Sequence, residues 1–184
     1  MTDWSNSQLF YTDANGRQNV KRRRNWRPDY DLANATSEEP VASNYYPINA
    51  WISMEDTKSN RWVSILTDRS SGAASISDDS IEVMVHRRLL DDDAFGVQQP
   101  LNETEFGKGI VARGKHLITF EGSKSANIRT VRQIANTLFS SPIVTMNNRA
   151  GTGNYVVPTS AASVELPINV NLLTLAVIPE TKQV

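Results

Sequence analysis

The sequence predicts an all-β protein, a large β-sandwich with one short helix near residues 126–139. Short stretches rich in β-branched and aromatic residues recur along the chain, and turn-forming residues separate them. Only one segment has apolar residues at the spacing of a helix. The chain has 184 residues, 39% of them hydrophobic and 21% charged, so we expect residues 1–184 to form one β-sandwich region around a core.

The N-terminal part of the chain predicts a β-hairpin. Residues 8–12 have the composition of a strand, and a tight turn is expected at 13–16. This turn contains Asn15-Gly16, and Asn-Gly between extended segments is the strongest short-range hairpin signal. The returning limb, residues 17–27, carries a run of basic side chains.

A second hairpin is expected between residues 50 and 67. Its strands are 50–54 and 62–67, and the polar turn 55–60 joins them. Just before it, Pro47 limits residues 44–48 to the edge of a sheet, because proline cannot donate a ladder hydrogen bond. Polar and small residues predict surface loops at 29–43 and 68–75.

The sequence also predicts a central strand at residues 81–88. Apolar and polar residues alternate there, which is the pattern of a strand with one buried face. The alternating apolar residues are Ile81, Val83 and Val85. A long polar loop, 91–109, is expected next, followed by a strand at 110–120 in which Gly114 marks a bulge.

The predicted helix has its apolar residues at spacings of three and four. These residues are Ile128, Val131, Ile134, Ala135 and Leu138. Ser125 is the expected cap at its start, and Pro142 lies beyond its end. Further strands are expected at 143–146 and at 170–178, where a long apolar run is typical of a strand covered on both faces.

Three consecutive aspartates follow the predicted central strand, where a loop can present polar groups to a ligand. They are Asp91, Asp92 and Asp93. A catalytic pair of carboxylates has to flank a scissile bond, which adjacent residues on one loop rarely do. A cation site and a solvated or sugar-contacting rim are the other interpretations. His86 and His116 are the two histidines, and their positions do not match a zinc-ligand pattern, so we expect no metal site in this chain.

The charge pattern gives little reason to expect a nucleic-acid partner. The net charge is -1, and the basic run within residues 21–27 is short. No apolar run reaches the roughly 18 residues typical of a membrane span, so no membrane partner is expected either. Two sequons predict N-glycosylation at Asn34 and Asn102.

Taken alone, these residues give no complete active site, since neither a P-loop nor a Gly-x-Ser-x-Gly elbow is present in the sequence. One hypothesis is therefore a free-standing carbohydrate-binding or interaction module. Such a module should expose aromatic platforms beside polar groups. The candidates are Trp26, Tyr45, Tyr46, Trp51 and Trp62.

Nine ordered blocks, spread from about residue 9 to residue 176, carry a family resemblance. The blocks are 10–17 (FYTDANGR), 22–24 (RRR), 44–47 (NYYP), 66–69 (LTDR), 82–90 (EVMVHRRLL), 92–93 (DD), 101–104 (LNET), 112–116 (ARGKH) and 172–176 (LLTLA). Together they resemble the C-terminal β region of lysosomal-type α-mannosidases, glycoside hydrolase family 38.

This resemblance implies a supersandwich, galactose-mutarotase-like fold and a place in a larger enzyme. That enzyme would be a retaining, zinc-dependent α-mannosidase that removes terminal α-mannose from N-linked glycans, in the lysosome or outside the cell. The resemblance places the zinc ligands and the nucleophile in an N-terminal catalytic domain. It therefore implies that this chain is a fragment without catalytic residues or a cofactor, inactive alone, whose partners are that domain and mannose-containing glycans.

The resemblance also implies a role for the loop after the predicted central strand. In the family, a loop of this region reaches the rim of the active site, and residues 91–96 match it best. Asp92, Asp93 and Phe95 are then the expected mannose-contacting residues. Family members often carry Arg-Gly where this chain has Phe95-Gly96, so a guanidinium contact is lost here, whereas a backbone carbonyl contact is not. The alternative is a loop that only braces the interface between the domains.

Overall fold

The computed structural model describes residues 4–32, 38–139, 167 and 170. The chain divides into two units, residues 1–143 and residues 144–184. All the strands and helices given below lie in the first unit. Within the described residues, no helix is long and apolar enough to cross a membrane.

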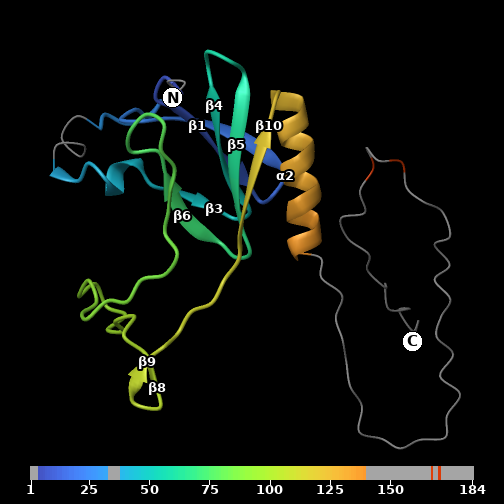
Figure 1. Cartoon of the computed structure of the whole chain (residues 1–184). Coiled ribbons are helices and arrows are strands. Elements are labelled where there is room, and N and C mark those ends of the chain that lie inside the picture. Colours follow the sequence, from blue (N-terminus) through green and yellow to red (C-terminus); the bar gives the residue numbers. More distant parts are fainter. Residues whose placement is uncertain (1–3, 33–37, 140–166, 168–169, 171–184) are drawn as a thin grey trace, which may run out of the picture. The chain divides into compact units, whose positions relative to one another are not determined.

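The larger of two packed sheets has five antiparallel strands in the order β10-β5-β4-β1-β2 (Figure 1). Its strands are β1 (Leu9–Ala14), β2 (Gln18–Arg23), β4 (Trp51–Asp56), β5 (Arg61–Thr67) and β10 (His116–Glu121). The two predicted hairpins are thereby confirmed, because β1 pairs with β2 and β4 pairs with β5.

A smaller three-stranded sheet covers one face of the larger sheet. Its strands, in the order β3-β6-β7, are β3 (Tyr46–Ile48), β6 (Ser71–Ala74) and β7 (Glu82–Val83), and the 3-10 helix η1 (Ala42–Asn44) precedes β3. Pro47 lies in the edge strand β3, as predicted. Side chains of both sheets form one buried cluster, which consists of Phe10, Tyr46, Ile48, Ile52 and Ala73. Two sheets packed over a shared core, with one helix, confirm the predicted all-β sandwich.

The helix α2 (Lys124–Phe139) packs on the other face of the larger sheet (Figure 1). Val131 and Ala135 of the helix join Ala50, Trp51 and Leu66 of the sheet in a second buried cluster. The predicted helix is therefore confirmed, but the predicted cap is wrong.

The N-terminus of α2 is capped by Ser123 and not by Ser125. The Ser123 hydroxyl accepts a hydrogen bond from the Ala126 N–H at 3.2 Å, while Ser125 lies inside the first turn. The sequence offered two serines at nearly equivalent positions, and the helix starts at Lys124, two residues before the predicted start at residue 126.

A buried polar cluster ties the helix to the sheet. Ser53 and Ser64 are directly paired across β4 and β5, and their hydroxyl oxygens are 2.7 Å apart. The Ser64 hydroxyl donates to the side-chain oxygen of Asn127 at 2.6 Å, and the Asn127 amide returns a bond to the Ser53 hydroxyl at 3.3 Å. The three side chains are fully buried, so they satisfy one another where water does not reach.

The turn between β1 and β2 has the geometry that its sequence predicts. Asn15 and Gly16 both have positive φ angles, 52° and 68°, which glycine and asparagine tolerate best. The Arg17 N–H donates to the Ala14 carbonyl at 3.0 Å and closes the turn.

Asp13, at the end of β1, links this turn to the start of β4. Its carboxylate accepts the Gly16 N–H at 2.7 Å within the turn. Its other oxygen accepts the N–H groups of Asn49, Ala50 and Trp51 at 2.8, 2.9 and 3.1 Å. Asp13 is only 5% exposed, so one buried carboxylate satisfies four backbone donors from two segments.

Several predicted elements are wrong in extent. The predicted strand at 81–88 is reduced to the two residues of β7, and Val85 is exposed. The predicted strand at 110–120 begins only at His116, so Gly114 precedes it and forms no bulge within it. The predicted loop at 68–75 contains β6. The predicted strand at 143–146 and all of 170–178 except Val170 lie outside the described residues, as do Pro142 and Asn34.

We predict that Asp13→Ala lowers the free energy of unfolding by about 3 kcal/mol or more, because it leaves several buried N–H groups without an acceptor. Asp13→Asn should cost less, since one oxygen of matching shape remains. Urea denaturation followed by circular dichroism measures both changes. Asp91→Ala, at an exposed aspartate, is the control and should stay within about 0.5 kcal/mol of the parent chain. Equal stability of the Asp13 and Asp91 variants would contradict the assigned role.

Candidate functional site

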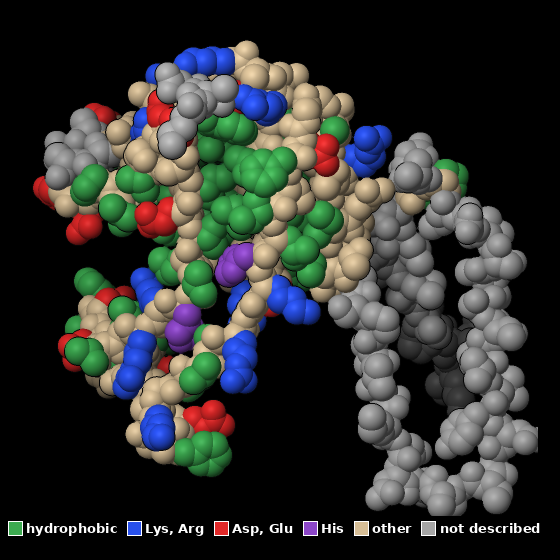
Figure 2. All heavy atoms as spheres, viewed as in Figure 1, with side chains coloured by type: hydrophobic (Ala, Val, Ile, Leu, Met, Phe, Trp, Pro, Cys, Tyr) green, Lys and Arg blue, Asp and Glu red, His purple; other side chains and the backbone are tan. Residues whose placement is uncertain are grey.

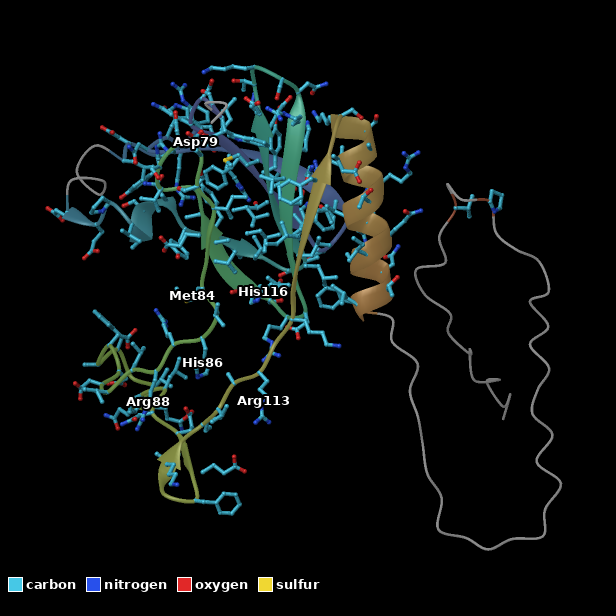
Figure 3. All side chains as sticks on the ribbon, in the orientation of Figure 1. Asp79, Met84, His86, Arg88, Arg113 and His116 are labelled. Atoms are coloured by element: carbon cyan, nitrogen blue, oxygen red, sulfur yellow. The ribbon has the colours of Figure 1, made fainter. Side chains whose placement is uncertain are left out.

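Residues 84–115, called the arm below, leave the sandwich after β7 and return at β10 (Figure 1). The arm contains the short hairpin formed by β8 (Thr104–Glu105) and β9 (Lys108–Gly109). Figure 3 shows Met84, His86 and Arg88 on its outgoing limb, with Arg113 on the returning limb. All the sequence-predicted substrate-contacting residues lie in the arm.

The outgoing limb of the arm is fixed to β6. The Met84 N–H donates to the Gly72 carbonyl at 2.8 Å. The Ser71 hydroxyl donates to the Met84 carbonyl, so the backbone of this residue is held on both sides. The chain leaves the sheet only beyond this point.

The returning limb is fixed by Asp68 and Arg69, which connect β5 to β6. The Asp68 carboxylate accepts the Lys115 N–H at 2.9 Å, and the Arg69 guanidinium donates to the Arg113 carbonyl. Asp68 and Arg69 also pair with each other at 2.9 Å. Both limbs are thus anchored on residues 68–72, which the sequence predicted only as part of a loop. No local pattern marks Asp68 and Arg69, because their partners lie more than 40 residues further along the chain.

The charge of Asp68 is favoured by its surroundings. The hydrogen bond from Arg69 is the main reason that the pKa of Asp68 lies below its ordinary value of 3.8, and the bond from the Lys115 N–H acts in the same direction. The same pairing raises the pKa of Arg69. The ionised carboxylate is therefore the form that holds the arm.

Further bonds close the loop between the two limbs. The Leu89 N–H donates to the Leu101 carbonyl at 2.9 Å. The Arg88 guanidinium donates to the side-chain oxygen of Asn102, the residue of the second sequon. A hollow of about 440 Å³ lies between the limbs. It is lined by His86, Arg87, Arg88, Leu101, Glu103, Gly109 and Ile110.

Asp92, Asp93 and Phe95 lie together in the loop that these hydrogen bonds close. The Asp92 carboxylate accepts the Ala94 N–H at 3.2 Å, and the Asp93 carboxylate accepts the Phe95 N–H at 3.1 Å. These two successive turns shape the loop and project Phe95 into solvent, where it is 91% exposed. The second carboxylate oxygen of Asp92 is shielded from solvent and has no hydrogen-bond partner among the described residues.

The arm exposes an unusual amount of apolar side chain. The most exposed apolar residues in it are Leu90, Phe95, Val97, Phe106 and Val111. Figure 2 shows hydrophobic side chains at the surface of the sandwich as well, and β10 contributes Ile118 and Phe120 to that surface. Where exposed apolar side chains form a contiguous patch, they are typical of a protein interaction site.

Two other sequence candidates have different surroundings. Two guanidinium groups of the basic run contact groups of the same chain: Arg24 pairs with Asp78 at 2.6 Å, and Arg22 lies 4.3 Å from the ring centre of Tyr46. Within the part of the chain that the structure describes, no three His, Cys, Asp or Glu side chains are grouped closely enough to hold a metal ion.

Comparison with known proteins identifies the family of this chain. The sequence profile of the glycosyl hydrolases family 38 C-terminal domain matches residues 2–95. The chain belongs to this family. The profile match includes β1 to β7 and the outgoing limb of the arm as far as Phe95, whereas β10 and α2 lie beyond it.

Individual relatives extend the similarity over most of the chain. The lysosomal α-mannosidase of Bos taurus is 44% identical over 174 residues, which cover 91% of this chain and 16% of that protein. That of Homo sapiens is 43% identical over 172 residues, with the same coverage. An α-mannosidase of Arabidopsis thaliana is 37% identical over 183 residues, which cover 95% of this chain and 17% of that protein. The chain thus spans about one sixth of the length of these relatives.

The anchor at Asp68 predicts a pH dependence for the returning limb. Because the folded pKa lies below the ordinary 3.8, the stabilisation is fully present above that value and is lost as the pH falls through the folded pKa. We expect hydrogen-exchange protection of the Lys115 amide to persist in mildly acidic buffer and to decrease below about pH 4. Asp68→Asn should lower the protection at every pH and remove this dependence. Retained dependence in the variant would assign the titration to another group.

Proposed function

We propose that this chain is the C-terminal β-sandwich segment of a retaining, zinc-dependent α-mannosidase that hydrolyses terminal α-mannose from N-linked glycans. Its relatives named above are α-mannosidases, and two of them are lysosomal, which supports a lysosomal or secreted location for the parent enzyme. In this proposal the chain packs on an N-terminal catalytic domain, and its arm reaches the rim of the mannose site.

The observation that carries this proposal is the construction of the arm. Both limbs of the arm are hydrogen-bonded to the sandwich, and a further backbone hydrogen bond joins the limbs to each other. A solvent-exposed loop with no function needs neither feature. At its far side the arm presents the exposed ring of Phe95 and the exposed carboxylate of Asp93. This carboxylate would accept a hydrogen bond from a sugar hydroxyl, and the ring of Phe95 would cover an apolar sugar face.

The arm residues are assigned to binding and not to the chemical step. Asp92 and Asp93 belong to one tight loop, whereas glycoside hydrolysis needs two carboxyl groups on either side of the scissile bond. The described residues of this chain also do not fit a zinc site, so no step of the reaction is derived through a metal held here. We assign both the nucleophile and zinc to the catalytic domain.

A free-standing carbohydrate-binding or interaction module is the second candidate. The exposed apolar side chains of the arm favour the first proposal, because a separate module would keep such surface covered. A segment of a larger enzyme instead covers it with the neighbouring domain.

The decisive experiment replaces Phe95 in the intact enzyme that contains this chain. Phe95→Ala should raise KM for a mannose-terminated oligosaccharide by about tenfold with little change in kcat, because a binding contact is removed while the reacting groups stay in place. Asp93→Asn should act in the same direction, since the amide cannot accept the same hydrogen bonds at both positions.

Phe106→Ala is the matched control, because Phe106 belongs to the same arm and is 95% exposed. Its KM should equal that of the parent enzyme. Unchanged KM in Phe95→Ala would contradict the mannose contact. Equal losses of thermal stability in both variants, with unchanged KM, would leave the arm with a bracing role only.

A further inference from the structure

Two further exposed aromatic side chains lie far from the arm in sequence. They belong to residues 25–32, called the aromatic loop below. Trp26 is 51% exposed and Tyr30 is 64% exposed. By contrast, Trp51 and Trp62 are completely buried in the sandwich. The chain thus buries Tyr46, Trp51 and Trp62 and half-buries Tyr45, but it leaves Trp26 in solvent, with Tyr30 in the same loop.

The start of the aromatic loop is rigidly held by Asn44. The Asn25 N–H donates to the side-chain oxygen of Asn44 at 2.7 Å, and the Asn44 amide donates to the side-chain oxygen of Asn25 at 2.7 Å. The same Asn44 amide donates to the Pro40 carbonyl at 2.9 Å. Asn44 is buried, so these bonds are protected from water.

The middle and the end of the aromatic loop are also fixed. The Arg27 guanidinium lies 4.5 Å from the ring centre of Tyr46 and donates to the Ser43 carbonyl at 3.3 Å. Leu32 is buried and ends the loop. Trp26 and Tyr30 therefore project from a backbone that is fixed before a ligand arrives, which lowers the entropic cost of binding.

The aromatic loop encloses a surface hollow of about 480 Å³, a volume within the range of small-molecule sites. Alongside the two aromatic rings, its lining includes the charged side chains of Arg27, Asp29 and Asp31. Asp29 and Asp31 are exposed at the hollow. An aromatic wall with nearby carboxylates matches a hexose, which has apolar C–H faces and a rim of hydroxyl donors.

We propose that the aromatic loop is a glycan-binding subsite in which Trp26 and Tyr30 stack on a hexose ring and Asp29 accepts hydrogen bonds from its hydroxyls. The choice of mannose as the hexose rests on the proposed function, while the recognition of a hexose rests on this loop alone. The hollow of the aromatic loop and the hollow of the arm share no lining residue, so the subsite would bind a part of the glycan other than the mannose at the arm. Its role is to hold a longer glycan and not to take part in the reaction.

The test uses the full chain with both sequons removed by Thr36→Ala and Thr104→Ala, so that no glycan of its own competes. An α-linked mannotriose is titrated while the indole N–H signals are followed by NMR. We expect the Trp26 signal to shift and those of the buried Trp51 and Trp62 to stay. Trp26→Ala and Tyr30→Ala should each weaken binding by about tenfold or more. Phe120→Ala, at an exposed aromatic of β10, is the matched control and should bind like the parent chain.

Each outcome bears on the subsite separately from the arm, because no catalytic domain is present in the titration. A shift of Trp26 with mannotriose but not with cellotriose supports a mannose-selective subsite, and a shift with both supports a hexose subsite without that selectivity. No shift with either sugar overturns the proposal and leaves the test of Phe95 unaffected. Protection of Trp26 in the intact enzyme, without any response to sugar, overturns it in favour of an interface between domains.

Discussion

The fold depends above all on how one buried carboxylate joins two segments that are distant in the sequence. Asp13 accepts the turn N–H of Gly16 and three consecutive N–H groups at the entry to β4. This fixes where β4 begins, and in a strand the starting residue decides which face every later side chain occupies. With this register Trp51 faces the helix cluster and Ile52 faces the smaller sheet. A shift of one residue would exchange the two faces and move Ser53 from the helix face into the core between the two sheets.

The same register places the polar cluster that seats the helix. Ser53 follows two residues after Trp51, so it shares the helix-facing side and meets Ser64 and Asn127 there. These three side chains satisfy one another only when α2 lies in a single rotational position, because each hydroxyl and amide has its partner in a fixed direction. Apolar contacts between Val131 and the sheet hold the helix down, while the polar cluster selects its orientation.

The sequence was informative wherever the signal is local. Asn15-Gly16 encodes a turn, and the helical spacing around Val131 encodes one buried stripe, so both were predicted correctly. The alternation that ends at Val85 was misleading, because it predicts a buried face without saying which molecule buries it. In a chain that covers about one sixth of its relatives' length, apolar residues can be buried by a partner. The long-range partners of Asp13 and Asp68 could not be predicted, since they lie more than 30 residues away and leave no periodic pattern.

This architecture makes the position of the arm a property of the sandwich. Both limbs are held by residues 68–72, a short connection between β5 in the larger sheet and β6 in the smaller one. Any change that moves one sheet against the other also moves this connection, and with it the loop that carries Asp92 and Phe95. If this loop contacts mannose as proposed, damage to the core, even far from a substrate, would misplace the contacting groups. A displacement of about 1 Å is enough to weaken a positioned contact severely. Under the proposed function, a sandwich without catalytic residues would in this way control an active site whose reacting groups belong to another domain.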